Sequence, residues 1–367
     1  MKALFTFFLL AILTNVCHAQ WREGESMVER KAAHDNRSTE PGAPLPSLNQ
    51  AVSPSGKFII KPDNSGRLNF DSTLAQNFKH AIDSIGNKYS VRGMSAAVLI
   101  PGQGIWLGTY GYSTTPPDSI RSETLFNIGS QTKTFTSALV LKLVEEGRLS
   151  LDDSIGRWLS PLANISPQIT VRQLLNHTSG LYDYVNDSQS WYSAMIAEPN
   201  RNWSQEELLA TFLGAPHSPP GGPFYYSNTN YTVAGMIIRN ITGTNISTQL
   251  HQRIFAPHVL TSIFLCPEDT VHGVIAHPWS NGSDFSFFYG PAVHTSMWTW
   301  GAIYSTAEDM ARWVNALYGG QVLTPASLVQ MQTCVPEPPE WIASGAGIIW
   351  ISSKTSIDGT FPFWPKT

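Results

Sequence analysis

The feature that most constrains the fold is a stretch from Ser130 to about Glu146 that is helical in pattern and apolar on nearly every face. Such a helix has no side suited to water, so we expect it to be buried at the centre of a domain. Gly147 follows it, where glycine commonly ends a helix. Its first turn carries Ser130 and Lys133, which lie on one face because they are three residues apart.

Ser130 and Lys133 are candidate catalytic residues. The free backbone N–H groups and the dipole at a helix start favour negative charge near the Ser130 hydroxyl. A neighbouring amine can then take the hydroxyl proton and leave a nucleophile. The same four-residue pattern arises by chance in many chains, so the hypothesis needs partner residues elsewhere in the sequence.

The second candidate group is Tyr226-Ser227-Asn228, which follows the turn-rich segment 218–223. In an extended or loop backbone Tyr226 and Asn228 point the same way, because they alternate around Ser227. A phenol can relay a proton and an amide can hold a carbonyl group. For this tripeptide alone, a surface loop tyrosine is the simpler interpretation.

Together, Ser130-x-x-Lys133 and Tyr226-x-Asn228 resemble the serine β-lactamase and penicillin-binding protein superfamily. The closer resemblance is to its class C β-lactamase-like branch, especially the secreted D-alanyl-D-alanine carboxypeptidases of the Streptomyces type. It covers roughly residues 72–350 in the family's order. Four further segments share it: 149–153, 169–181, 226–238 and 305–310.

The resemblance implies an α/β (α+β) fold, with an antiparallel sheet flanked by helices and a mostly helical subdomain. It implies that Ser130 attacks a peptide or lactam carbonyl and forms an acyl-enzyme, which water or an amine resolves. Lys133 and Tyr226 share the proton transfer, and which of them is the base stays open. Asn228 contacts Lys133 and the substrate amide. No cofactor is implied.

The implied function is that of a D,D-carboxypeptidase or β-lactamase-related hydrolase, acting on small peptide, peptidoglycan-derived or β-lactam substrates. Two alternatives stay open: an esterase or D-amino-acid amidase of the same branch, and an inactive penicillin-binding remnant. His177, within the sequence Asn-His-Thr-Ser-Gly, is interpreted as structural because the family does its chemistry without it.

The third family motif is Lys or His, then Thr or Ser, then Gly, on a strand that binds the substrate carboxylate and adds an oxyanion-hole N–H. Residues 344–350 resemble the glycine-rich stretch before that strand. We assign substrate binding to Lys366 and Thr367, which lack the glycine. The segment Lys354-Thr355-Ser356 is an internal alternative, and complete absence of the motif is a third.

We therefore expect a truncated family member that lacks its C-terminal strands. Losing one oxyanion donor costs about 10²–10³ in rate. The hairpin predicted at 95–110 should then have an unpaired edge and an uncovered apolar face. Such a chain should fold poorly and hydrolyse its substrate slowly.

Residues 1–19 are predicted to be a signal peptide, cleaved after Ala19, so we expect a secreted or periplasmic protein. Residues 20–66 are predicted to be a linker or pro-segment, and 67–367 the hydrolase domain. The length suits one large domain or two intertwined ones. Cys266 and Cys334 would remain after cleavage and can pair in an oxidising compartment. We expect a monomer.

The rest of the sequence excludes several classes of protein. The net charge is −4, and no basic patch suggests nucleic acid. After the signal no run is long enough to span a bilayer. No His-Glu-x-x-His or paired cysteine cluster suggests a metal.

The local patterns predict further elements outside the central helix. Helices are expected at 71–88, 170–177, 204–213 and 303–317, and strands at 95–100 and 104–110. The segment Ser305-Thr306-Ala307-Glu308 is expected to open the last helix as a capping box.

Overall fold

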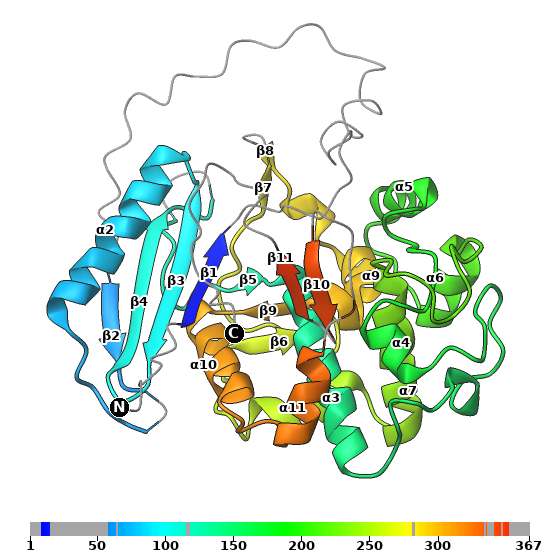
Figure 1. Ribbon diagram of the computed structural model, residues 1–367. Helices are drawn as coiled ribbons and strands as arrows, with labels where there is room; N and C mark the ends of the chain where they lie inside the picture. The colour runs from blue at the N-terminus through cyan, green and yellow to red at the C-terminus, as the bar shows by residue number, and fades with distance from the viewer. Residues whose placement is uncertain are drawn as a thin grey trace, which may run out of the picture. The chain divides into compact units, whose positions relative to one another are not determined.

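The chain forms two compact units in a computed structural model (Figure 1). Unit 1 comprises Met1–Phe126, His272–Tyr289 and Ser305–Arg312, and unit 2 comprises the remaining residues. The structure describes residues 9–14, 58–63, 65–114, 118–280, 283–333, 335, 341–345 and 348–351.

Unit 1 is built on a four-stranded antiparallel sheet with the order β1–β3–β4–β2. The predicted hairpin is confirmed as β3 (Gly93–Ile100) and β4 (Gly104–Gly111). The predicted helix is confirmed as α2 (Ser72–Lys88), which Asp71 caps. Buried side chains of α2 pack against the sheet in one apolar core, in which Trp106 is 1% exposed.

The expected unpaired edge and uncovered face of this hairpin are wrong. β1 (Leu9–Thr14) pairs with β3, β2 (Phe58–Lys61) pairs with β4, and every residue of β3 and β4 is buried. A strand edge needs only an extended neighbour, and here both neighbours come from segments that precede α2 in the chain. β2 also lies in the predicted linker, so ordered structure begins earlier than expected. β1 lies in the predicted signal peptide, whose cleavage stays a prediction.

Asp63, which follows β2, fastens two turns of unit 1. Its Oδ1 accepts hydrogen bonds from the backbone N–H groups of Ser65 (2.9 Å) and Arg67 (3.0 Å), and its Oδ2 accepts one from Gly102 N (2.6 Å). Burial opposes ionisation, but these bonds and one from the Ser65 hydroxyl outweigh it and lower the pKa of Asp63 to about 2.

This lowered pKa predicts a loss of stability in acid. The unfolded carboxyl, with a pKa of 3.8, takes up its proton first as the pH falls. The contribution is therefore complete above about pH 4 and is lost as the pH falls towards 2; it is on the order of 2 kcal/mol. Urea unfolding from pH 2 to 7 should show a smaller acid loss in Asp63→Asn than in the unmutated protein. An equal decrease in the free energy of unfolding between pH 4 and pH 2 in the two proteins would contradict the role of Asp63.

Unit 2 is mostly helical, and the predicted central helix is α3 (Thr132–Glu145). Ten of its residues are buried, and it contacts α7, α8, α9 and α11. Gly147 has a φ of +67° and follows the helix, as predicted. Ser130 does not lie within α3 itself but in the 3₁₀ turn η1 (Gly129–Gln131) that leads into it. The partner helices are α7 (Asn228–Thr242), α8 (Ile246–Leu250), α9 (Pro291–Gly301) and α11 (Pro325–Gln332).

Two other predicted helices are present in unit 2. They are α4 (Val171–Leu175) and α6 (Gln205–Phe212), and each begins with a capping box. Helix α5 (Gln189–Ala197) was not predicted, and neither were α7, α8, α9 and α11. The remaining short elements of the two units are η2 (Ile155–Arg157), η3 (His251–Phe255), η4 (Ser286–Phe288), β7 (Trp279–Ser280) and β8 (Ser283–Asp284).

The predicted helix at 303–317 is partly wrong. Its first residues form the strand β9 (Ile303–Ser305), in a small sheet of order β5–β9–β6, and the helix α10 spans Ala307–Tyr318. Ser305 therefore belongs to a strand, and Thr306 caps α10 by accepting a hydrogen bond from Asp309 N at 3.2 Å. The other strands are β5 (Phe126–Asn127) and β6 (Ile263–Leu265).

The described residues of the glycine-rich segment, 344–345 and 348–350, lie in a two-stranded antiparallel pair, β10 (Trp341–Gly345) and β11 (Ile348–Ile351). Lys366 and Thr367 lie outside the described residues, as does the alternative segment 354–356. Cys266 is a buried free cysteine, whereas Cys334 lies outside the described residues.

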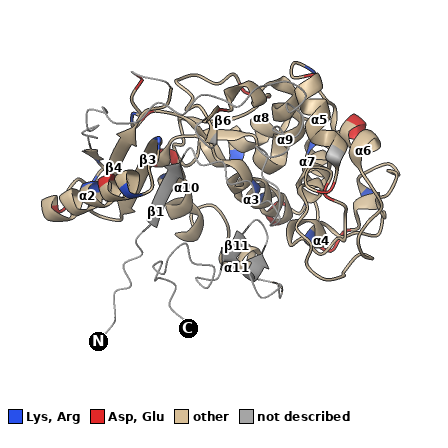
Figure 2. Cartoon of the chain, turned by 90° about the horizontal axis from the view of Figure 1, so that it is seen from above, with Lys and Arg blue, Asp and Glu red and all other residues tan. Residues whose placement is uncertain are grey.

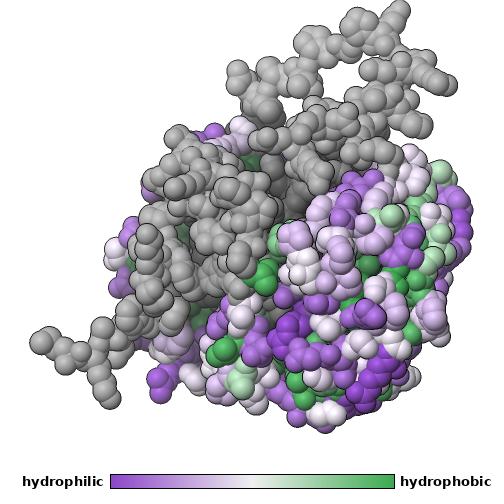
Figure 3. Space-filling model, turned by 45° about the vertical axis from the view of Figure 1, so that its right-hand side comes forward, coloured by the Kyte–Doolittle hydropathy of each residue, from purple (hydrophilic) through white to green (hydrophobic). Residues whose placement is uncertain are grey.

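In the view of Figure 2, positions of Lys and Arg and positions of Asp and Glu are interspersed along the described helices and loops. On the face shown in Figure 3, polar and apolar residues are intermixed. None of the described helices combines the length and the apolar character that crossing a bilayer requires.

Candidate active site

Ser130 is exposed on the turn that precedes the buried helix α3. The turn begins at Gly129, whose φ of +51° suits glycine. Asn127 fastens it, because its Oδ1 accepts a hydrogen bond from Gly129 N at 3.1 Å and its Nδ2 donates one to Gly301 O at 3.0 Å. These hydrogen bonds hold the turn that presents the exposed Ser130.

Four of the predicted site residues meet around this hydroxyl. Ser130 Oγ lies 2.8 Å from Tyr226 Oη and 3.2 Å from Lys133 Nζ. Lys133 Nζ also donates hydrogen bonds to Asn228 Oδ1 at 2.8 Å and to Trp300 O at 3.1 Å. Two further acceptors, Asn228 Oδ1 and Trp300 O, therefore hold the amine beside the hydroxyl.

Tyr226 and Asn228 reach the site from the start of α7. Ser227 between them is extended (φ −144°, ψ 125°) and precedes the first helical residue, Asn228. The predicted loop geometry fits Tyr226 and Ser227, whereas Asn228 is already helical. Both side chains still face the same point, as the alternation predicted.

Burial sets the protonation states of the two candidate bases. Lys133 is 2% exposed, and desolvation lowers the pKa of its amine to about 7, an effect that the charge of Asp183 partly opposes. Desolvation raises the pKa of the Tyr226 phenol, although its bond to Ser130 acts in the opposite direction. Near neutral pH a substantial share of the amine is therefore neutral, while the phenol keeps its proton.

His177 supports Tyr226. Its Nδ1 accepts hydrogen bonds from Ser227 N and Asn230 Nδ2, both at 3.1 Å, which assigns its proton to Nε2. The imidazole stacks on the Tyr226 ring at 4.6 Å between centroids. Burial, with the charge of Lys133, lowers the pKa of His177 well below its usual value. These contacts fit the structural interpretation.

A kink in α9 frees the Trp300 carbonyl oxygen, which accepts the hydrogen bond from Lys133 Nζ. Trp298 has non-helical angles inside the helix (φ 30°, ψ −116°), so the carbonyl groups of the next two residues leave the helical hydrogen-bond pattern. Thr136 Oγ1 donates to Thr299 O at 2.7 Å, and Lys133 donates to Trp300 O. Strained residues of this kind gather at functional sites. Trp298 and Trp300 were not predicted as site residues, because neither breaks the local pattern.

Asp183 is the other residue that the sequence analysis missed. It is completely buried, and its Oδ2 accepts a hydrogen bond from Asn228 Nδ2 at 3.0 Å. Desolvation raises its pKa to about 6, although several hydrogen bonds favour the ionised form. The one available signal was its position directly after the segment 169–181, which matched the family. Among the described residues no three His, Cys, Asp or Glu side chains are grouped as metal ligands.

This geometry, an accessible serine beside a buried lysine and a part-buried tyrosine, is that of a serine hydrolase of the β-lactamase type. The chain belongs to the Beta-lactamase family, whose model matches residues 74–360. The superfamily and the α/β fold predicted from the sequence are thereby confirmed, whereas the closer resemblance to Streptomyces-type carboxypeptidases stays a prediction.

Curated relatives include penicillin-binding protein 4* of Bacillus subtilis, which is 26% identical over 67% of this chain and 56% of its own length. Protein flp of Staphylococcus aureus strain MRSA252 is 30% identical over 68% of this chain and 49% of its own length. The chain thus spans about half the length of these relatives.

The matches to solved structures with the same fold cover more of the matched chains than the matches to the curated relatives do. The D-amino acid amidase of Ochrobactrum anthropi SV3, complexed with L-phenylalanine, has a TM-score of 0.68 at 28% identity. The match covers 77% of this chain and 82% of the amidase. A D-stereospecific amidohydrolase from Streptomyces sp. has a TM-score of 0.63 at 28% identity, over 76% and 83% of the two chains.

Proposed function

We propose that this protein is an acyl-serine hydrolase that cleaves the amide bond following a D-amino acid residue, as in D-Ala-D-Ala peptides. β-Lactams, which present a comparable amide, are the related substrate class. The observation that supports this most is the Ser130 hydroxyl, which lies within hydrogen-bond reach of both Tyr226 and Lys133.

The roles follow from the protonation states. Neutral Lys133 takes the Ser130 proton, directly or through the Tyr226 hydroxyl, while Oγ bonds to the substrate carbonyl carbon. The proton then passes to the leaving amine, and the C–N bond breaks to give an ester on Ser130. Water or another amine attacks the ester and regenerates the hydroxyl. Tyr226 serves as the relay because its raised pKa keeps the phenol protonated.

A D-amino-acid amidase is the second candidate. It would use the same residues, and it is favoured by the similarity to the Ochrobactrum amidase, most of whose chain is matched. An esterase would also share Ser130, Lys133 and Tyr226. These candidates differ in the group that leaves and in what binds beyond the reacting carbonyl.

A substrate panel separates the candidates. The full chain is assayed with a D-Ala-D-Ala peptide, D- and L-phenylalanine amides and a p-nitrophenyl ester, with Ser130→Ala as the control. We expect release of D-alanine that disappears in Ser130→Ala. Cleavage of D-phenylalanine amide alone would support the amidase, and cleavage of the ester alone the esterase. No Ser130-dependent turnover of any substrate would overturn the proposal.

A further inference from the structure

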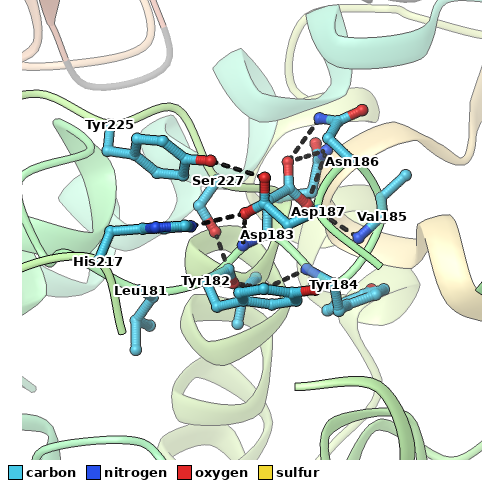
Figure 4. A network of polar contacts seen from close by, with 12 residues as sticks. Leu181, Tyr182, Asp183, Tyr184, Val185, Asn186, Asp187, His217, Tyr225 and Ser227 are labelled. Atoms are coloured by element: carbon cyan, nitrogen blue, oxygen red, sulfur yellow. Dashed lines mark hydrogen bonds and ion pairs between the residues drawn. The ribbon is translucent and has the colours of Figure 1, made fainter. Parts of the chain in front are cut away.

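The loop 182–187 brings a buried carboxylate to the back of the candidate site. Asp183 Oδ1 accepts a hydrogen bond from Val185 N at 3.0 Å, and its Oδ2 accepts bonds from Asn186 Nδ2 at 2.6 Å and Asn228 Nδ2 at 3.0 Å. Figure 4 shows Val185 and Asn186 of the loop beside the Asp183 carboxylate. All of these neighbours are donors, which suits an ionised carboxylate.

This arrangement fixes which way the Asn228 amide faces. A carboxylate only accepts hydrogen bonds, so Asn228 must present its NH₂ group to Asp183. Its carbonyl oxygen is then left facing Lys133, which donates to it at 2.8 Å. If the amide turned over, an NH₂ group would face an ammonium group and the contact would be lost.

We propose that Asp183 is a positioning residue for the reaction proposed above: its carboxylate orients the Asn228 amide, and the amide holds the Lys133 amine at Ser130. The inference rests on the proposed function for its catalytic meaning. Asp183 does not itself contact the substrate-facing hydroxyl; it acts through Asn228.

The loop is fastened by a second carboxylate that does not contact Asn228. Asp187 Oδ2 accepts hydrogen bonds from Asp183 N at 2.9 Å and lies 2.8 Å from His217 Nε2. Asp187 Oδ1 accepts one from Tyr225 Oη at 2.7 Å. These contacts are visible in Figure 4. Asp187 therefore offers a control for the Asn228 contact: it is a second carboxylate on the same loop and is bonded to the backbone of Asp183, but it does not orient the Asn228 amide.

The groups around Lys133 decide the sign of a pH test. Besides Asp183, it faces the neutral imidazole of His177, the protonated phenol of Tyr226, and the rings of Tyr231 and Trp300 at 5.5 and 5.3 Å. Asp183 is thus the counter-charge to which the amine responds. Asp187 adds negative potential at Asp183 rather than at Lys133. Removing the Asp183 charge must lower the pKa of Lys133 further.

The test measures the rate at which a labelled penicillin acylates Ser130, from pH 5 to 9. In Asp183→Asn we expect the plateau rate to fall roughly 10- to 100-fold, as for other residues that orient a functional group. In the profile of acylation rate against pH, the rise on the acidic side (the acidic limb) should move to lower pH by about one unit. The reason is that removing the opposite charge of Asp183 lowers the pKa of Lys133. Asp187→Asn should leave the limb in place. A fall in rate with no shift of the limb would assign Asp183 a structural role only and overturn the proposal.

A double-mutant cycle tests whether Asp183 acts through the amide. In an Asn228→Ala background, Asp183→Asn should lower the plateau rate much less than it does in the unmutated protein. Equal losses in the two backgrounds would contradict the proposal. If Asp183→Asn does not fold, Asp183→Glu replaces it. This variant keeps the charge, so the limb should stay while the plateau falls; an unchanged plateau would contradict the proposal.

A readout without turnover separates this inference from the proposed function. In protein with ¹³C-labelled lysine, the NMR titration of Lys133 should move to lower pH in Asp183→Asn, and an unmoved titration would overturn the inference. If the unmutated protein is not acylated and the Lys133 titration still moves, the proposed function fails while the positioning role stands.

Discussion

Replacing Lys133 with methionine is expected to lower the rate of Ser130 acylation by about 10²–10⁴-fold, the usual contribution of a general base. Methionine keeps the length and fills the buried space, so the loss reflects the amine rather than packing. The measurement is the second-order rate constant for a labelled penicillin or for the best substrate of the panel. Lys142→Met, nine residues later on the same helix and part-exposed, is the control and should leave the rate unchanged.

The same amine should set the pH dependence. Its neutral form grows as the pH rises through about 7, so the acylation rate of the unmutated protein should rise over that range and level off above it. In Lys133→Met this rise should be absent. A methionine variant that keeps both the rate and the acidic limb would show that Lys133 is not the base.

The largest expected effect on stability is at Phe135, on the helix that follows the nucleophile. Its side chain is completely buried, stacked on Trp313 at 4.2 Å and edge-on to Phe255 at 5.8 Å. Phe135→Ala should lower the free energy of unfolding by about 3–5 kcal/mol, from lost burial and the cavity left behind. The loss is measured by chemical unfolding of both proteins, with their m-values compared.

Lys142→Ala on the same helix, at a part-exposed position, should change the free energy of unfolding by less than about 0.5 kcal/mol. If Phe135→Ala lowered the free energy of unfolding by less than about 1 kcal/mol, the packing of α3 in the core would not stabilise the fold as expected. The acylation rate of folded Phe135→Ala should also fall, because α3 positions Lys133.

The parts of the site that could be predicted are those whose residues are close together in the sequence. Ser130 and Lys133 are three residues apart where a helix begins, and the apolar pattern after them is strong enough to predict burial. The alternation in 226–228 likewise predicts that two side chains face one way. In each case, the geometry depends on backbone periodicity rather than on distant contacts.

The rest depends on contacts between residues far apart in the chain. Asp183 lies in a loop without periodicity, and only the folded chain brings it to Asn228. The non-helical angles of Trp298 have no local sequence signal, because no glycine or proline marks that position. The helix predicted from Ile303 failed for a related reason, because an apolar strand of three residues cannot be distinguished from a helical face by pattern alone. β2 was missed because four residues in a polar region give too short a signal.

The central claim is that Ser130 is the nucleophile, and mass spectrometry of the intact protein after incubation with penicillin tests it most directly. We expect a mass gain of one penicillin, located by peptide fragmentation on Ser130 and absent from Ser130→Ala. No adduct, or an adduct on another residue that persists in Ser130→Ala, would contradict the claim.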